Sequence, residues 1–305
     1  MPVVSIRHRT VYRYRNPVAF GEHRVMYRPQ EAFDQRLLSA ELSVSPDPEL
    51  LRHVHDLSGA SVAVARFAGR ADQLVFESRV RVDHTPSAPF DLDAGDWTLG
   101  PEGFAYGPDE HADLERAVRR RHPDDGQVEA WGRRFVRPVG RTRLATLLSD
   151  MTHAVRRDFT YAQRLQGEAQ APLATLESRS GSCRDFALLM IEAARSLGLA
   201  AQFASGYVYS GSPKSGRAGG GHTHAWARVY LPDCGWTDFD PTNGIVGSAD
   251  LVRVASVTEP RMAVPLHGSW DGLRSDFLGM EVEVDASAEP EARQPQLAWR
   301  VGQGL

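Results

Sequence analysis

Apolar and polar residues alternate along much of the first quarter of the chain. Between Val4 and Tyr14 every second residue is large, and most of the residues between them are arginine or serine. The same period of two returns at residues 38–44 and 74–82, and the stretch SVAVARF lies between these two segments. This pattern is typical of strands with one face turned toward a core. Short strands separated by Asp, Pro and Gly turns predict an antiparallel β-sandwich-like domain over residues 1–86.

The pattern then changes to one that is typical of helices. Residues 87–108 are rich in turn residues and have no clear period, so we interpret them as a connector. Beyond them, apolar residues recur at helical spacing, and the most apolar of these helices begins at Cys183 and ends at Gly198. The other expected helices cover residues 111–121, 125–137 and 142–155, the last with Thr142 as its N-cap.

Three strand-like segments follow the helix that begins at Cys183, at residues 200–210, 222–231 and 235–240. Helices followed by an antiparallel sheet predict an α+β catalytic domain over residues 109–285. The last residues, 286–305, are polar and contain prolines, so we interpret them as a tail.

Composition narrows the class of protein. A chain of 305 residues with 42% hydrophobic and 24% charged residues is typical of a folded, two-domain protein. A formal net charge of −4 gives no footprint for nucleic acid, and the sequence shows no apolar run long enough to span a membrane. Two cysteines cannot form a disulfide scaffold, and the N-terminus lacks a signal-peptide pattern, so we expect a cytoplasmic protein.

One of the two cysteines, Cys183, lies in SGSCRDF at the expected start of a helix. Ser182 can cap this helix, and Asp185 can reach back to it as in a capping box. The first turn places the thiol near unpaired N–H groups and the positive end of the helix dipole, which both favour a thiolate. An inert core cysteine is the simpler interpretation unless a partner base lies nearby.

Two downstream residues are candidates for partners of this thiol. His224 lies in THAW on one strand-like segment, and Asp240 ends the next, GWTDFD. If these segments pair as a hairpin through LPDCG, the two side chains can lie side by side. A nucleophilic thiol needs a base that takes and returns its proton, and that base needs a third group to fix its tautomer. The residues Cys183, His224 and Asp240 are therefore the candidate catalytic set.

Other residues in this region allow different interpretations. His222 and His224 form an H-x-H pair that could bind zinc with Cys183, but no further Cys/His pair stands at zinc-site spacing. We therefore expect no metal and no organic cofactor. Cys234 lies in a turn and is interpreted as a surface or packing thiol. The glycine-rich residues 210–221 lack the order of a phosphate-binding loop and are interpreted as a loop that can gate the site.

The segments GSCRDFALLMIEAARSLGLAAQFASGYVY, HAWARVYLP and GWTDFDPTNG resemble the catalytic core of the transglutaminase-like superfamily. The early HRTVYRYRNPV resembles the β-rich domain that precedes this core in bacterial members. The resemblance implies a papain-like arrangement, with the nucleophile at Cys183, the histidine at His224 and the acid at Asp240. The pattern departs after Asp250, because SVTEPR stands where many bacterial relatives carry an Arg-Asp-Tyr stretch.

These residues together predict acyl transfer through a thioester, from an amide of a protein or peptide to a primary amine or to water. A cysteine peptidase or amidase with the same three residues is one alternative, and a non-catalytic binding scaffold is another. The backbone N–H of Cys183 is the expected oxyanion donor, and Tyr161 in FTYAQ is a second candidate. The sequence leaves open the oligomeric state and the choice between amine and water.

Overall fold

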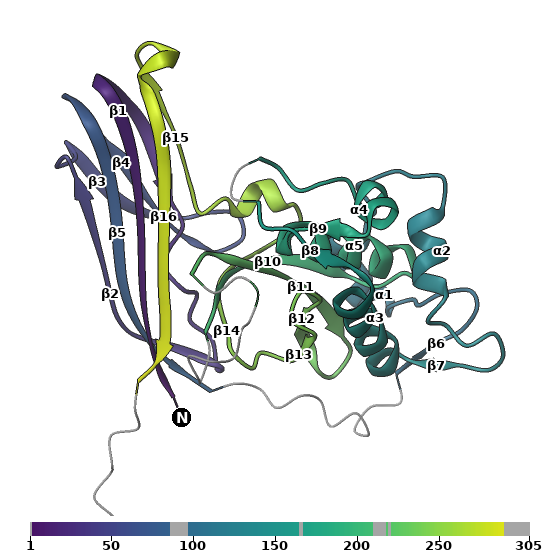
Figure 1. The fold of residues 1–305 in the computed structure, drawn as a ribbon. Coiled ribbons are helices and arrows are strands. Elements are labelled where there is room, and N and C mark those ends of the chain that lie inside the picture. Colours follow the sequence, from purple (N-terminus) through teal and green to yellow (C-terminus); the bar gives the residue numbers. More distant parts are fainter. Residues whose placement is uncertain (1, 86–96, 165–166, 210–217, 219–220, 290–305) are drawn as a thin grey trace, which may run out of the picture.

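The computed structural model describes residues 2–85, 97–164, 167–209, 218 and 221–289. The chain forms a curled antiparallel sheet in its N-terminal region and a core in which helices pack on a second antiparallel sheet (Figure 1). In Figure 1 the core sheet lies between the curled sheet and the helices. The α+β class and the antiparallel, β-rich N-terminal region are as the sequence predicts.

The central strand of the curled sheet is β1, which is long enough to pair with different strands along its two halves. Its first half, up to Tyr14, lies between β5 and β16, and its second half lies between β4 and β15. Register shifts between the halves mark an irregularity where the strand changes partners. The strands of this sheet are β1 (Val3–Val25), β2 (Gln35–Ser45), β3 (Leu50–His55), β4 (Ser61–Arg66), β5 (Arg70–His84), β15 (Leu266–Asp271) and β16 (Phe277–Ala288).

Strands β15 and β16 differ from the predicted domain boundaries. The sequence pattern assigned residues up to 285 to the catalytic domain and the rest to a tail, whereas β16 pairs with β1 over its whole length, from Ala288 opposite Val4 to Phe277 opposite Tyr14. Charged residues occupy every second position of 281–285, so the segment is only weakly apolar. Its strand partner lies at the other end of the chain, where no local pattern points to it. The predicted tail beyond residue 289 lies outside the described residues.

The core is organised around helix α5 (Cys183–Ser196), which is buried on nearly all sides. It packs against the middle strands of a sheet with the order β13-β12-β11-β10-β14. The strands are β10 (Ala201–Val208), β11 (His224–Leu231), β12 (Gly235–Asp240), β13 (Ile245–Val246) and β14 (Leu251–Val257). The predicted hairpin of β11 and β12 is confirmed, with Ala227 opposite Phe239.

Shorter elements surround α5. Helix α3 begins at Leu144 with Arg143 as its N-cap, one residue after the predicted N-cap Thr142, because Thr142 belongs to a short strand and its Oγ1 accepts a hydrogen bond from the Arg137 N–H at 2.7 Å. No helix in the described ranges is both long and apolar enough to cross a membrane. The remaining elements are α1 (Pro108–Val118), α2 (Gln127–Arg133), α3 (Leu144–Asp158), α4 (Pro172–Ser178), β6 (Thr98–Leu99), β7 (Thr142–Arg143), β8 (Thr160–Tyr161), β9 (Ser180–Gly181), η1 (Pro260–Ala263) and η2 (Arg274–Asp276).

Buried polar contacts join the curled sheet to the core sheet. His8 of β1 and the Tyr207 hydroxyl of β10 are hydrogen-bonded at 3.0 Å from Nδ1 to Oη. Tyr207 in turn donates to the Tyr27 carbonyl at 3.2 Å, so its oxygen accepts from His8 Nδ1, which carries a proton. His84 and Tyr209 form a second such pair at 2.8 Å. The two sheets therefore meet through hydrogen bonds with defined partners, which fixes how β1 and β16 lie against the core.

Candidate active site

Cys183 is the first residue of α5 and is 8% exposed. The predicted cap is present, because the Asp185 carboxylate accepts hydrogen bonds from the Ser182 N–H at 2.7 Å and from the Ser182 hydroxyl at 2.9 Å. A carboxylate and a thiol thus share the first turn of the helix, where the N–H groups lack partners within the helix. The cap fixes the direction in which the chain enters α5 and so the position of Cys183.

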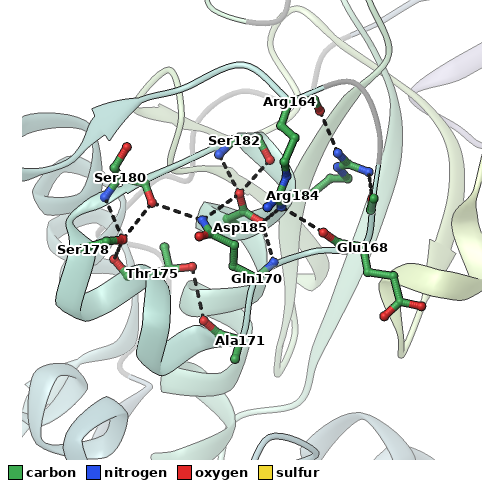
Figure 2. Close-up of polar contacts among 11 residues, drawn as sticks. Arg164, Glu168, Gln170, Ala171, Thr175, Ser178, Ser180, Ser182, Arg184 and Asp185 are labelled. Atoms are coloured by element: carbon green, nitrogen blue, oxygen red, sulfur yellow. Dashed lines mark hydrogen bonds and ion pairs between the residues drawn. The ribbon is translucent and has the colours of Figure 1, made fainter. Parts of the chain in front are cut away.

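Asp185 also holds a second segment against the start of α5 (Figure 2). Its Oδ1 accepts hydrogen bonds from Arg164 Nη2 at 2.6 Å and from the Gln170 N–H at 2.7 Å. Arg184 adds two hydrogen bonds to backbone carbonyls of the same segment, from Nη2 to Arg164 and from Nη1 to Gly167, both at 2.7 Å. The sequence showed the capping role of Asp185 but not this one, because Arg164 and Gln170 come from a stretch with no periodic signal.

His224 and Asp240 form a buried pair at the facing ends of β11 and β12. His224 Nε2 lies 2.8 Å from Asp240 Oδ2, and neither side chain is exposed. The hairpin register places Asp240 diagonally across from His224 on the same face of the sheet. The other oxygen, Oδ1, accepts the Thr242 N–H at 2.9 Å, and Asn243 Nδ2 donates to Oδ2 at 2.8 Å. Thr242 and Asn243, which the sequence analysis missed, therefore hold the carboxylate in place.

This geometry shifts the pKa values of both His224 and Asp240. Burial by itself lowers the pKa of His224, but Asp240 and then Cys183 outweigh it and raise that pKa to about 10. Burial by itself raises the pKa of Asp240, but His224, Asn243 and the Thr242 N–H bring it below its ordinary value. The pair is therefore an imidazolium and a carboxylate at neutral pH. His224 Nδ1, the ring nitrogen that does not face Asp240, is buried and has no hydrogen-bond partner among the described residues.

Trp226 supports the ring of His224. The two rings stack with centroids 6.1 Å apart, and Trp226 Nε1 donates to Asp238 Oδ1 at 2.7 Å. Asp238 is itself buried and also pairs with Arg228, at 3.0 Å from Nε to Oδ1. Gly206 leaves the room for this arrangement, since a Cβ there would lie 2.9 Å from the Trp226 ring. Asp238 thus belongs to the support of the histidine strand, although nothing in the sequence marked it.

Tyr161 lies next to the cysteine turn because β8 and β9 pair in parallel, with Tyr161 opposite Gly181. Burial, followed by the charges of Cys183 and Asp240, raises the pKa of the Tyr161 phenol to about 12. The hydroxyl is therefore neutral at physiological pH and can donate a hydrogen bond. Its ring packs edge-on against Phe186 of α5 at 6.5 Å. The structure thus brings the predicted second oxyanion donor to the same site as Cys183.

One cavity of about 580 Å³ is shared by the thiol, the histidine and the phenol, whereas Asp240, Asp238 and Trp226 are not part of its lining. Cys183, His224 and Tyr161 line it together with His222 and the segment of Arg164. Glu259, Pro260 and Arg261, the last residues of the SVTEPR stretch that departs from the family pattern, form another side of it with the residues from Ala263 to Leu266. Within the described ranges no group of three His, Cys, Asp or Glu side chains could hold a metal ion. Cys234 is exposed in the turn between β11 and β12.

The predicted gating loop falls mostly outside the described residues. Of its members the structure describes Ala218 and Gly221. The Ala218 N–H donates to Asn243 Oδ1 at 3.0 Å, and Asn243 Nδ2 donates back to the Ala218 carbonyl at 3.1 Å. This part of the loop is therefore tied to the residue that also holds Asp240.

Comparisons with known proteins identify the family of both regions of the chain. Residues 4–83 match the bacterial transglutaminase-like N-terminal region, and residues 133–241, which include Cys183, His224 and Asp240, match the transglutaminase-like superfamily. An uncharacterised protein of Mycobacterium tuberculosis is 28% identical over 291 residues, which covers 92% of this chain and 91% of its own length. An uncharacterised protein of Mycobacterium leprae is 29% identical over 133 residues, 42% of this chain and 46% of its own.

A solved structure shares the fold. It is the crystal structure of a protein of Cytophaga hutchinsonii proposed to be a cysteine protease, and it superposes with a TM-score of 0.69 at 16% identity over 96% of this chain and 93% of its own. The similarity extends over both the curled sheet and the core. This chain therefore belongs to the transglutaminase-like superfamily, and its core follows a bacterial transglutaminase-like N-terminal region.

Proposed function

We propose that this protein is a thiol enzyme that acts on amide bonds, with Cys183 as nucleophile, His224 as general acid and base, and Asp240 as the group that orients His224. The observation that carries the proposal is the buried His224–Asp240 pair at 2.8 Å, whose histidine lines one cavity together with Cys183. A charged histidine is costly to bury. Its position beside Cys183 therefore favours a reactive thiol over an inert core cysteine. The chain's membership of a superfamily of such enzymes supports the same conclusion.

The reaction begins with the thiolate of Cys183 and the imidazolium of His224. The thiolate attacks the amide carbonyl, and the C–S bond forms as the carbonyl electrons move onto oxygen. The backbone N–H of Cys183 and the neutral phenol of Tyr161 are placed to donate to that oxygen. When the C–N bond breaks, His224 protonates the departing nitrogen from Nδ1, which leaves a thioester and a neutral imidazole.

The second half of the reaction reverses these roles. A primary amine or a water molecule attacks the thioester while His224 Nδ1 takes its proton, the C–S bond breaks, and the thiolate and imidazolium are restored. The products are a new amide with an amine, or a carboxylic acid with water. Asp240 stays ionised throughout and holds Nε2–H, so that Nδ1 is the nitrogen that exchanges protons. We propose a protein or peptide as the acyl donor.

Mass spectrometry with a glutamine-containing peptide tests the proposal. Incubation with the peptide and a primary amine should give a thioester on Cys183 and then an amine adduct or the free acid. Iodoacetamide at limiting concentration should label Cys183 faster than the exposed Cys234, although Cys183 is buried, because an imidazolium favours the reactive thiolate. Free acid at every amine concentration would make the protein a peptidase or amidase. No acyl-enzyme with any peptide and equal labelling of both thiols would leave a non-catalytic scaffold.

A further inference from the structure

The cavity that contains Cys183 extends far beyond the reacting groups. Its lining includes β1 and β16 of the curled sheet on one side and the segment around η1 on another. Cavities of ~300–1,000 Å³ hold whole small ligands, and this one measures about 580 Å³. It therefore has room for substrate residues on either side of a reactive amide. In Figure 1, β16 runs along the side of the curled sheet that is turned toward the core.

The face that β1 and β16 turn toward the cavity is apolar at Tyr12, Met280 and Val282 and carries His8 and Thr10 farther along β1. Thr10 pairs with Val282, and Tyr12 pairs with Met280, so these four side chains lie on one face of the sheet. Alternate residues such as Glu281 point to the opposite face. The strands thus separate a charged outer face from an apolar inner one, and the inner one lines the cavity. We call Tyr12, Leu266, Met280 and Val282 the β16 patch.

The register of β16 also relates this patch to the segment that precedes His224. The Val284 N–H donates to the Gly221 carbonyl at 3.1 Å, so the strand passes the histidine segment at this residue. Met280 lies four residues farther along, which is ~14 Å in an extended strand. A substrate in an extended conformation covers that distance in about four residues.

We propose that the β16 patch binds a bulky apolar side chain of the acyl donor, such as Phe or Leu, about two to four residues from the reactive amide. This inference rests on the proposed function, because it takes Cys183 as the point of attack. An apolar side chain gains by leaving water for the contact with Met280 and Val282, whereas a charged one loses its hydration there without a counter-charge on the patch. The N-terminal region is thereby a part of the substrate site and selects the donor.

Peptide binding to the Cys183→Ala protein tests the proposed preference for an apolar side chain and requires no reaction at residue 183. The probes are fluorescent peptides with one central glutamine in an alanine background, in which Phe, Leu, Lys or Asp replaces a single alanine at each of four positions on either side. At one of the positions two to four residues from the glutamine, Phe or Leu should bind about tenfold more tightly than Ala, and Lys or Asp should not. Equal affinities for all peptides would overturn the proposal. A failure of the proposed chemistry would leave these affinities unchanged and so is distinguishable.

A charge placed in the patch gives the sharper test. Met280→Glu in the same background should weaken binding of the best Phe peptide about tenfold and strengthen binding of the corresponding Lys peptide. The matched control is Leu278→Glu on the same strand, since Leu278 is 57% exposed and does not line the cavity. It should leave both affinities unchanged. A stronger interaction with the Lys peptide cannot come from misfolding, and equal effects of the two substitutions would refute the role of the patch.

Discussion

His8 makes the stability of this protein sensitive to acid. It stacks on the Tyr27 ring at 3.7 Å between centroids and donates to Tyr207, and its exposure of only 1% favours the neutral imidazole. Burial, and to a smaller degree the charge of His222, lowers the pKa of His8 to about 3. The unfolded chain, by contrast, takes up a proton on this side chain near pH ~6.5.

The direction in which stability changes with pH follows from proton uptake by the unfolded chain. Between pH ~6.5 and about 3 the unfolded state binds a proton that the folded state does not, so stability falls as the pH falls. Each pH unit below ~6.5 lowers the free energy of unfolding by about 1.4 kcal/mol, so roughly 2 kcal/mol of stability is lost at pH 5 relative to pH 8. His224 acts in the opposite direction, because its raised pKa favours the folded state below pH ~6.5 and the benefit is lost as the pH rises toward about 10. The wild-type curve alone therefore cannot isolate His8.

The comparison with His8→Gln isolates it. The free energy of unfolding should be measured by urea denaturation of both proteins from pH 8 to pH 5. We expect the advantage of the wild type over the variant to shrink by roughly 2 kcal/mol across that range, because the variant cannot take up this proton. His53→Gln, which replaces an exposed histidine of β3, should leave the pH dependence unchanged. A difference between wild type and His8→Gln that is constant from pH 8 to pH 5 would contradict the reasoning.

Two further substitutions test the site. Asp240→Asn can keep the hydrogen bond from the Thr242 N–H but turns an amide toward His224 Nε2, which imposes the wrong tautomer. Turnover should fall by up to ~10⁴ at a temperature at which circular dichroism shows the variant to be folded, although loss of the buried charge partner lowers its melting temperature. Turnover within twofold of wild type would remove Asp240 from the mechanism. Asp185→Asn takes the charge from a buried acceptor of Arg164 and should lower the free energy of unfolding by ~1–3 kcal/mol. Asp158→Asn, which weakens an exposed pair with Arg157, should cost clearly less in the same denaturation experiment, and equal losses would show that the Asp185 contacts add nothing.

The sequence by itself determined the elements and the candidate residues that local patterns encode. Period-two alternation marks β1 and β5, and the apolar stripe and cap mark α5 with Cys183 at its first turn. The short connection between β11 and β12 also made the hairpin predictable, and with it the approach of His224 to Asp240. These features depend on residues that are close in sequence, where spacing and side-chain type constrain the backbone directly.

Only the tertiary structure decided which distant segments meet around the cysteine. The pairing of β16 with β1 joins the two ends of the chain, and the charged residues of β16 gave no sign of a partner so far away. The hydrogen bond from Arg164 to Asp185 likewise joins α5 to a stretch whose sequence has no periodic pattern. The cavity is the space left when the curled sheet docks on the core. Its shape depends on that docking, because no single segment encloses it.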